Sequence, residues 1–262
     1  MAEGKRTHSL HDGCRGLVRL VSASSDRRFI IGNDEVHIWR ADLSSEEHAC
    51  RLEHLLSSDE IKRANRFRFP QHRRRFVIAR GCLRTLLGGY LGMDARELIF
   101  AYSAEGKPSL DPRHKSDIRF NVSHSGDIAA FGIVVARDIG VDVEMIGREV
   151  DVDEIPKRFF SSAEQQMLAG LRGEDKYRGF FNCWTRKEAY VKAVGSGLSL
   201  PLRDFDVSLL PGEPAKLLAT RPDKNLVDRW SMASLDFGNG CAAAVVVEGH
   251  VEKIELRRFI PF

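Results

Sequence analysis

The chain has 262 residues, of which 43% are hydrophobic and 29% are charged, and its formal net charge is +3 at pH 7. This length can bury one large core or two small ones, and the near balance of charge excludes a disordered polyelectrolyte. No run of 18 apolar residues is present, so we expect no membrane span. The five cysteines are scattered without a CxxC pair, which is typical of reduced thiols in a cytoplasmic protein.

Residues 1–34 mix glycine, serine, arginine and histidine with little periodicity. We interpret them as an N-terminal extension of low order. The apolar stretch LVRLVSAS could also be read as part of an export signal. Arg19 interrupts that stretch and no clear cleavage site follows it, so the extension is the favoured interpretation.

The first half of the folded region, residues 35–137, begins with a predicted strand. Val36–Arg40 alternates apolar and polar residues, as a half-buried strand does. The run Ser57-Ser-Asp-Glu60 fits a capping box and predicts a helix after Ser57. The apolar face of Phe76–Leu91 predicts a second helix. Short strands are then predicted over residues 98–102, 118–122 and 128–135.

The second half, residues 138–262, repeats this order of elements. After a predicted strand over Ile139–Met145, Ser161-Ser-Ala-Glu164 is a second capping box that opens a short helix. A long helix is predicted over Phe180–Val194, with closing strands over residues 242–248 and 251–256. We therefore expect two similar α/β halves with a boundary near Asp138.

Charge is distributed unevenly between the two halves. Residues 61–93 contain nine Lys or Arg and no acid, whereas residues 138–154 contain seven acids and one Arg. A basic wall beside an acidic patch can bind an anion through a divalent metal, which the acids would hold.

The run Gly140-Val-Asp-Val-Glu144 is the first candidate site. Side chains alternate along a strand, so Asp142 and Glu144 share one face, with α-carbons about 6.6 Å apart. Carboxylates placed in this way can converge on Mg²⁺, which prefers oxygen ligands. The alternative is an ordinary amphipathic strand with one wet face, and the pattern by itself favours that alternative.

A second candidate is the helix that contains Trp184, Glu188 and Lys192, which form one stripe at a spacing of four residues. Exposed Glu–Lys pairs at this spacing are common and purely structural. The Trp and the apolar neighbours predict partial burial, which favours a functional pair. Glu188 is then a candidate metal ligand or base and Lys192 a candidate phosphate ligand. Lys187, on the adjoining stripe, is a weaker candidate.

Three further motifs are ambiguous when each is taken alone. Asn121–Gly126 is expected to be a turn whose serines and histidine either donate hydrogen bonds to an anion or form a plain polar hairpin. Gly106-Lys-Pro108 presents one lysine on a turn. Arg66–Arg80 is either a nucleic-acid patch or a basic helix that packs Phe67, Phe69 and Phe76 inward. No P-loop or GxGxxG fingerprint is present.

Taken in order, these motifs resemble the 4'-phosphopantetheinyl transferases of the larger, Sfp-like type. The resemblance runs from Val36 to the last strands and rests on Arg66–Arg80 with its FRFP core, Gly106–Pro108, Asn121–Ser125, Gly140–Glu144, Phe159–Glu164 and Trp184–Lys192. It implies an α/β (α+β) fold whose two halves are related by a pseudo-twofold axis and enclose the active site. It also implies that Mg²⁺, or Mn²⁺ in its place, supports transfer of 4'-phosphopantetheine from coenzyme A to a serine of an apo acyl or peptidyl carrier protein. The released product would be adenosine 3',5'-bisphosphate.

By the same resemblance, Asp142, Glu144 and Glu188 are the expected metal ligands. Glu188 is also expected to deprotonate the acceptor serine, directly or through water, and Lys192 to contact the phosphates. The remaining residues expected to bind coenzyme A, with Lys187 included from the adjoining stripe, are Arg68, Arg80, Lys107, Ser123, His124 and Lys187.

Two other functions would each account for one motif and leave the rest unexplained. One is a nucleic-acid binding protein that uses the basic stretch 61–84, and the other is a metal-dependent enzyme acting on another nucleotide. We expect instead a cytoplasmic monomer with no nucleic-acid or membrane partner. Carriers of fatty-acid, polyketide, siderophore-peptide and lysine pathways all remain open as the acceptor.

Overall fold

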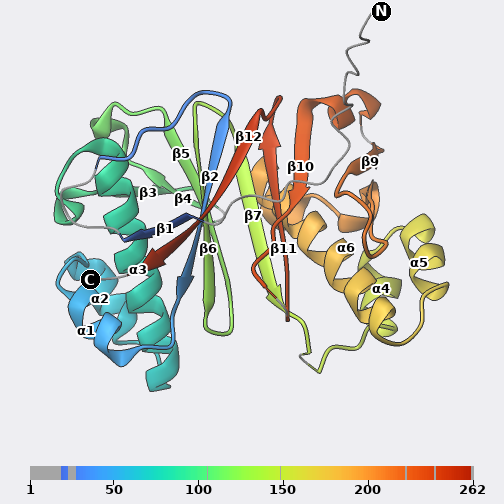
Figure 1. The fold of residues 1–262 in the computed structure, drawn as a ribbon, viewed down its shortest axis with the longest axis horizontal. Coiled ribbons are helices and arrows are strands. Elements are labelled where there is room, and N and C mark those ends of the chain that lie inside the picture. Colours follow the sequence, from blue (N-terminus) through green and yellow to red (C-terminus); the bar gives the residue numbers. More distant parts are fainter. Residues whose placement is uncertain are drawn as a thin grey trace, which may run out of the picture.

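The protein is described by a computed structural model over residues 19–22, 28–104, 106–147, 149–221, 223–238 and 240–260. The larger sheet has the strand order β1-β12-β2-β6-β5 (Figure 1). β12 is parallel to both of its neighbours, and the other pairs are antiparallel. Its strands are β1 (Arg19–Ser22), β2 (Glu35–Asp42), β5 (Ile118–Ser125), β6 (Ile128–Val135) and β12 (Lys253–Ile260).

The second sheet is antiparallel, with the strand order β10-β11-β7. Its strands are β10 (Trp230–Ser234), β11 (Cys241–Glu248) and β7 (Ile139–Met145). Two small antiparallel pairs complete the strands: β3 (Phe100–Tyr102) with β4 (Pro108–Leu110), and β8 (Phe205–Val207) with β9 (Leu217–Thr220).

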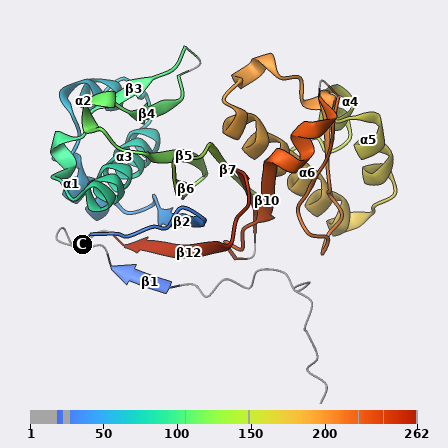
Figure 2. The same cartoon turned by 90° about the horizontal axis from the view of Figure 1, so that it is seen from above.

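The α-helices are α1 (Glu46–Glu53), α2 (Ser58–Ala64), α3 (Pro70–Leu91), α4 (Glu154–Phe159), α5 (Ser162–Ala169) and α6 (Gly173–Val194). Short 3₁₀ helices are η1 (Ala95–Glu97), η2 (Pro112–His114), η3 (Gly197–Ser199), η4 (Leu202–Asp204) and η5 (Lys224–Arg229). Helices α1–α3 lie on one side of the larger sheet, and α4–α6 lie beyond the smaller sheet (Figure 2). The predicted mixture of helices and sheets is confirmed.

Three apolar clusters hold these layers together. One joins α3 to the larger sheet and includes Trp39 and Leu86. The second lies between the two sheets, where Ile38 of β2 packs in one cluster with Val141 and Val143 of β7. The third joins α6 to the outer face of the smaller sheet. The alternation predicted for β7 is therefore confirmed, since its valines face the larger sheet and leave the other face for Asp142.

Both predicted capping boxes are present, at Ser57 with Glu60 and at Ser161 with Glu164. Helix α3 begins at Pro70 rather than at Phe76, because proline is well suited to the first helical position. Residues 121–125, expected in a turn, instead continue strand β5, and the turn follows at residues 126–127.

Strand β12 departs from the predicted division of the chain into residues 35–137 and 138–262. It comes from the second half of the sequence but pairs with β2 of the first half. The larger sheet is thus built from both halves, and a pseudo-twofold relation between them stays a prediction. Of the predicted N-terminal extension, residues 19–22 form β1 beside β12, while residues 1–18 and 23–27 lie outside the described residues.

Helix α6 crosses β7 at very short range, and Gly140 is the residue that permits it. A Cβ atom added at Gly140 would lie 2.0 Å from the carbonyl oxygen of Ala189 and 2.4 Å from the amide nitrogen of Ala193. The helix then ends at Gly195, whose φ of 74° is the left-handed conformation typical of a helix C-cap. This crossing brings the polar stripe of α6 over the polar face of β7.

Cys50, Cys82, Cys183 and Cys241 are free, whereas Cys14 lies outside the described residues. Among the helices that the structure describes, none is long and apolar enough to cross a bilayer.

Candidate active site

The candidate site lies where the two sheets meet, along the seam between β5 and β7. These strands belong to different sheets, yet alternate side chains of β5 hydrogen-bond to β7. The bonds run from Val141 N to Asn121 Oδ1 (2.9 Å), from Ser123 Oγ to Asp142 Oδ1 (2.8 Å) and from Ser125 Oγ to Glu144 Oε2 (2.6 Å). Both predicted carboxylates of β7 are therefore positioned by serines of β5.

Lys192 joins this seam from α6. Its Nζ lies 2.6 Å from Asp142 Oδ1 and 2.9 Å from Ser123 Oγ, and it also donates to the carbonyl oxygen of Val141 at 3.3 Å. The predicted stripe of α6 thus faces β7, and the structure brings Ser123, Asp142 and Lys192 into direct contact.

Asp142 is only 4% exposed, and its second oxygen, Oδ2, has no hydrogen-bond partner. Burial raises the pKa of this carboxyl group, although Lys192 and Ser123 act in the opposite direction. A buried acceptor without a partner costs about 1–3 kcal/mol, and more when it is charged. The environment of Asp142 therefore favours an additional positive partner at Oδ2.

Glu188 lies one helical turn before Lys192 and is half-buried. Burial raises its pKa, and the charges of Asp142 and Glu144 raise it further, whereas Lys192 lowers it. Two buried carboxyl groups with raised pKa values are expected where a divalent cation binds, and Mg²⁺ prefers such oxygen ligands. Within the described ranges, no three His, Cys, Asp or Glu side chains already converge as a metal-binding group. The fit to Mg²⁺ therefore lies in the donor types and in the unpartnered Oδ2 of Asp142, not in a preformed cage.

A cavity of about 770 Å³ opens beside the seam, which is in the range of small-molecule and cofactor sites. It draws residues from both halves of the sequence. The first half contributes Gly106–Pro108, Asn121 and Val122, and the second half contributes Arg158, Phe159, Trp184, Glu188, Val191, Lys192 and residues 200–203.

Lys107 lines this cavity, and its role as a ligand of coenzyme A stays a prediction. Its Nζ donates to the carbonyl oxygens of Lys192 and, at 3.5 Å, of Ile139. The ammonium group thus sits at the last turn of α6, where the helix dipole favours a positive charge. Burial lowers the pKa of Lys107.

Lys187 does not reach the cavity, and we correct the expectation that it binds coenzyme A. Its side chain is 0% exposed and its Nζ lies 2.8 Å from Glu164 Oε1. The same Nζ donates to the carbonyl oxygens of Leu202 (2.7 Å) and Phe205 (2.6 Å). These partners hold the ammonium group inside the protein, and Lys187 does not line the cavity. The sequence spacing correctly placed Lys187 next to the stripe of Glu188 and Lys192. It could not show that α5 packs against the face of α6 that carries Lys187.

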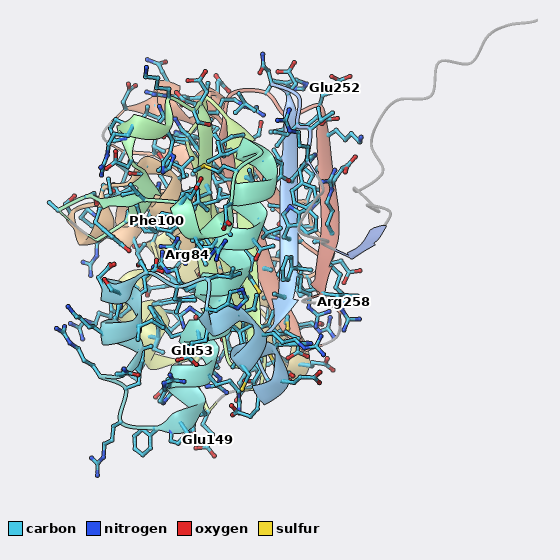
Figure 3. The ribbon with its side chains drawn as sticks, turned by 90° about the vertical axis from the view of Figure 1, so that its left-hand side faces the viewer. Glu53, Arg84, Phe100, Glu149, Glu252 and Arg258 are labelled. Atoms are coloured by element: carbon cyan, nitrogen blue, oxygen red, sulfur yellow. The ribbon has the colours of Figure 1, made fainter. Side chains whose placement is uncertain are left out.

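Two predicted arginines also lie away from the cavity. Arg80 is 9% exposed, and its guanidinium lies over the rings of Phe76 and Phe100, at 5.9 and 5.0 Å from their centroids. Figure 3 shows the α1–α3 side, with Phe100 and the neighbouring Arg84 labelled. Arg68 is exposed and lies over the ring of Phe69 at 5.5 Å. Neither arginine lines the cavity.

His124 alternates with Ser123 and Ser125 along β5, so it projects from the other face of the strand. Partial burial, together with the charges of Lys192 and Arg75, lowers the pKa of His124. Its ring therefore lies near both the seam and the start of α3, without lining the cavity.

Sequence reasoning missed several residues of the site. In a strand, Asn121 and Ser125 share a face with Ser123, because side chains alternate. The expectation of a turn at residues 121–126 concealed this alternation. Trp184, which was used only to predict burial of the stripe on α6, lines the cavity and makes an edge-to-face contact with Phe159 at 5.9 Å. Arg158 and Arg203 carry no sequence signal that marks them as cavity residues.

Comparisons with known proteins support the assignment suggested by the motifs. Residues 138–246 match the 4'-phosphopantetheinyl transferase superfamily, and residues 39–136 match the N-terminal region of 4'-phosphopantetheinyl transferases. The 4'-phosphopantetheinyl transferase HetI of Nostoc sp. (strain PCC 7120) is 44% identical over 219 residues, which cover 83% of this chain and 89% of that protein. This chain belongs to the 4'-phosphopantetheinyl transferases.

The transferase is also similar to 4'-phosphopantetheinyl transferase Sfp of Bacillus subtilis (strain 168), with 31% identity over 64% of this chain and 72% of that protein. Among solved structures, a holo-(acyl-carrier-protein) synthase from Bacillus anthracis str. Ames in complex with CoA (3',5'-ADP) is 23% identical, with a TM-score of 0.36 over 43% of this chain and 96% of that chain. The predicted family is confirmed, and the transferase is an enzyme.

Proposed function

We propose that this transferase moves the 4'-phosphopantetheine group of coenzyme A to a serine of an apo acyl or peptidyl carrier protein and releases adenosine 3',5'-bisphosphate. The observation that carries the proposal is the seam site, where Asp142, Glu188 and Lys192 lie beside a cavity lined by residues of both halves. Family membership supports the reaction class, and the residues at the seam are the types that it needs.

Asp142, Glu144 and Glu188 would hold Mg²⁺, or Mn²⁺ in its place. The ion would neutralise negative charge on the pyrophosphate and on the leaving bisphosphate. The unpartnered Oδ2 of Asp142 supports this role. Ser123 and Ser125 would keep the two carboxylates of β7 oriented through the hydrogen bonds they already make.

Lys192 and Lys107 would bind the phosphates of coenzyme A. Lys192 already lies at the seam, and Lys107 lies beside it at the end of α6. Both ammonium groups are already held in position at the seam. They would therefore stabilise negative charge as it develops, without a rearrangement of the side chains. The aromatic rings of Phe159 and Trp184, which also line the cavity, suit the uncharged pantetheine arm.

Glu188 would act as the base. A serine hydroxyl is a weak nucleophile and needs a nearby group to accept its proton. The serine oxygen would form a bond to the phosphorus that carries the pantetheine arm, and the bond from that phosphorus to the bisphosphate oxygen would break. The proton would pass to Glu188, directly or through water. Glu188 lines the cavity, so its carboxylate is placed to accept this proton.

Because two halves of one chain can enclose the site together, we propose a monomer. We also propose that it acts in the cytoplasm. The direct test is intact-protein mass spectrometry of a panel of apo carrier proteins incubated with the transferase, coenzyme A and Mg²⁺. We expect one carrier serine to gain a single phosphopantetheine group, and EDTA to abolish the gain. No gain on any carrier, together with no binding of coenzyme A, would overturn the proposal.

A further inference from the structure

Two arginines line the cavity without a role in the proposed transfer. Arg158 lies in α4 and Arg203 in η4, and both side chains are exposed. Within the part of the chain that the structure describes, neither forms an ion pair with an acid, and Glu154 of α4 pairs with Lys157 instead. The two guanidinium groups therefore bring to the cavity a positive charge that no described acid neutralises.

The two arginines contact each other and the aromatic rings of the cavity. Nη2 of Arg203 donates to the carbonyl oxygen of Arg158 at 2.8 Å. The guanidinium of Arg158 lies 5.2 Å from the ring centroid of Phe159. That ring lies 5.9 Å from the ring of Trp184, where α4 lies beside α6 (Figure 1). The arginines thus lie next to the rings that we assign to the pantetheine arm.

The length of the pantetheine arm matches this position. Trp184 lies two turns of α6 before Lys192, which corresponds to about 12 Å along the helix. The arm has about thirteen bonds between its phosphorus and its sulfur, and it spans about 15 Å when extended, since three bonds of an extended chain cover about 3.6 Å. An arm that runs along α6 from the seam would therefore carry its sulfur past Trp184, to where Phe159 and Arg158 lie.

The charge of the cavity favours an anionic group beside the arginines. The lining includes one acid, Glu188, and four cations: Lys107, Arg158, Lys192 and Arg203. In the proposed function the two lysines bind the phosphates of coenzyme A, which leaves the two arginines next to an uncharged arm. A guanidinium group binds a carboxylate well, because it can donate two parallel hydrogen bonds to it. Pantetheine has no carboxylate, whereas a carboxyacyl chain on its sulfur supplies one.

We propose that Arg158 and Arg203 bind the terminal carboxylate of coenzyme A thioesters of short dicarboxylic acids, and that the transferase selects these donors by their charge. This inference rests on the proposed function and names a class of donor for the same site. The serine oxygen of the carrier bonds to the phosphorus, the bond from phosphorus to the bisphosphate oxygen breaks, and the serine proton passes to Glu188. The thioester bond stays intact, so the carrier gains a carboxyacyl-phosphopantetheine group in one step.

The test compares donors that differ only in the terminal carboxylate. Malonyl-CoA and propionyl-CoA form one pair with carbon chains of equal length, and succinyl-CoA and butyryl-CoA form a longer pair. The acceptor is an apo carrier that the wild type modifies with coenzyme A itself. In at least one pair we expect the wild type to favour the carboxylated donor about tenfold or more in kcat/KM. Intact-protein mass spectrometry of the carrier identifies the group transferred.

The double variant Arg158→Gln/Arg203→Gln should lose most of this preference. The readout is the ratio of the two kcat/KM values within one variant, so a general loss of activity does not affect it. The matched control, Arg172→Gln/Arg178→Gln, removes the same charge from two exposed arginines outside the cavity and should keep the wild-type ratio. Calorimetric titration of each donor pair without a carrier should show the same preference as a ratio of affinities.

Four results would overturn the inference. The wild type could use both donors of each pair equally, or accept coenzyme A but none of the thioesters. A folded double variant could keep the wild-type ratio. It could also change only the KM for the carrier, which would show that the two arginines contact the carrier instead. Failure of the wild type to transfer phosphopantetheine from coenzyme A to any carrier would refute the proposed function itself.

Discussion

Asp142 is the residue on which the proposed metal site depends most. It is buried, it accepts hydrogen bonds from Ser123 and Lys192 through one oxygen, and its other oxygen has no partner. For folding alone this arrangement is unfavourable, because a buried carboxylate is left partly unsatisfied. A residue that costs stability in the ligand-free protein is typical of a functional site.

Replacing Asp142 by asparagine should therefore separate activity from stability. Asp142→Asn keeps the shape and one acceptor but removes the negative charge, so we expect kcat/KM for transfer to fall about a thousandfold. The free energy of unfolding should stay unchanged or rise, since burial already disfavours the charged form. Transfer rates and urea unfolding measure the two quantities. Wild-type activity in a folded variant would remove Asp142 from the metal site.

His37 offers a second prediction at this scale, outside the site. Its ring is 0% exposed, with Nδ1 2.6 Å from the hydroxyl of Tyr90 and Nε2 3.1 Å from the guanidinium of Arg257. Burial, and then the charge of Arg257, lower the pKa of His37 to about 4, against the opposing charges of Glu255 and Glu35.

The unfolded chain, with an ordinary histidine pKa near 6.5, therefore binds this proton more readily than the folded protein does. The stabilising effect of neutral His37 is complete above about pH 6.5 and is lost as the pH falls towards 4. Between pH 7.5 and pH 5 the free energy of unfolding should fall by about 2 kcal/mol more in the wild type than in His37→Gln. Equal slopes in urea unfolding at the two pH values would contradict this account.

At the scale of elements, the close crossing of α6 over β7 brings Lys192 against Asp142. Gly140→Ala would push a methyl group into the backbone of α6, where no side chain can move aside. We expect a loss of at least about 1–3 kcal/mol of stability and a clear fall in transfer activity, because Glu188 and Lys192 would shift from β7. Gly32→Ala, whose Cβ would make ordinary contacts with Glu35, is the control. If Gly140→Ala kept the wild-type stability and transfer activity, α6 and β7 could move apart without damage to the site, and this account would be wrong.

The buried pair of Lys187 and Glu164 links α6 to α5 and to the segment that contains Leu202. Lys187→Met would leave Glu164 buried without its cation, which should cost about 3–5 kcal/mol of stability. The double variant Glu164→Gln/Lys187→Met should recover part of that loss, since no charge would remain buried. Urea unfolding measures both. A stable Lys187→Met protein with a raised KM for coenzyme A would instead restore Lys187 as a ligand.

Local sequence patterns predicted where helices and strands occur better than they predicted which elements pack together. The capping boxes predicted the starts of α2 and α5, and the alternation of apolar and polar residues predicted β2 and the two faces of β7. Ser123 and His124 were predicted site residues, but Asn121 and Ser125 were missed because a polar strand with serine, histidine and asparagine resembles a turn in composition. Spacing on α6 predicted Glu188 and Lys192 together with Lys187, but only packing shows that Lys187 faces α5.

At the scale of the whole molecule, β12 near the end of the sequence pairs with β2 of the first half. The last strand of the second half lies between β1 and β2, so the larger sheet contains strands of both predicted halves, whereas the smaller sheet belongs to the second half alone. No local pattern in residues 253–260 specifies this partner, because pairing across more than 200 residues depends on the assembled fold. The seam between β5 and β7 has the same origin, and it is where the proposed site lies.

The central claim is that the carboxylates at this seam bind Mg²⁺ together with coenzyme A. Calorimetric titration of coenzyme A into the metal-free protein, with and without Mg²⁺, tests it most directly. We predict that Mg²⁺ tightens binding by about tenfold or more in the wild type, since metal and ligand would share a site, and that Glu188→Gln loses most of this coupling. Equal affinity for coenzyme A with and without Mg²⁺ in the wild type would contradict the claim.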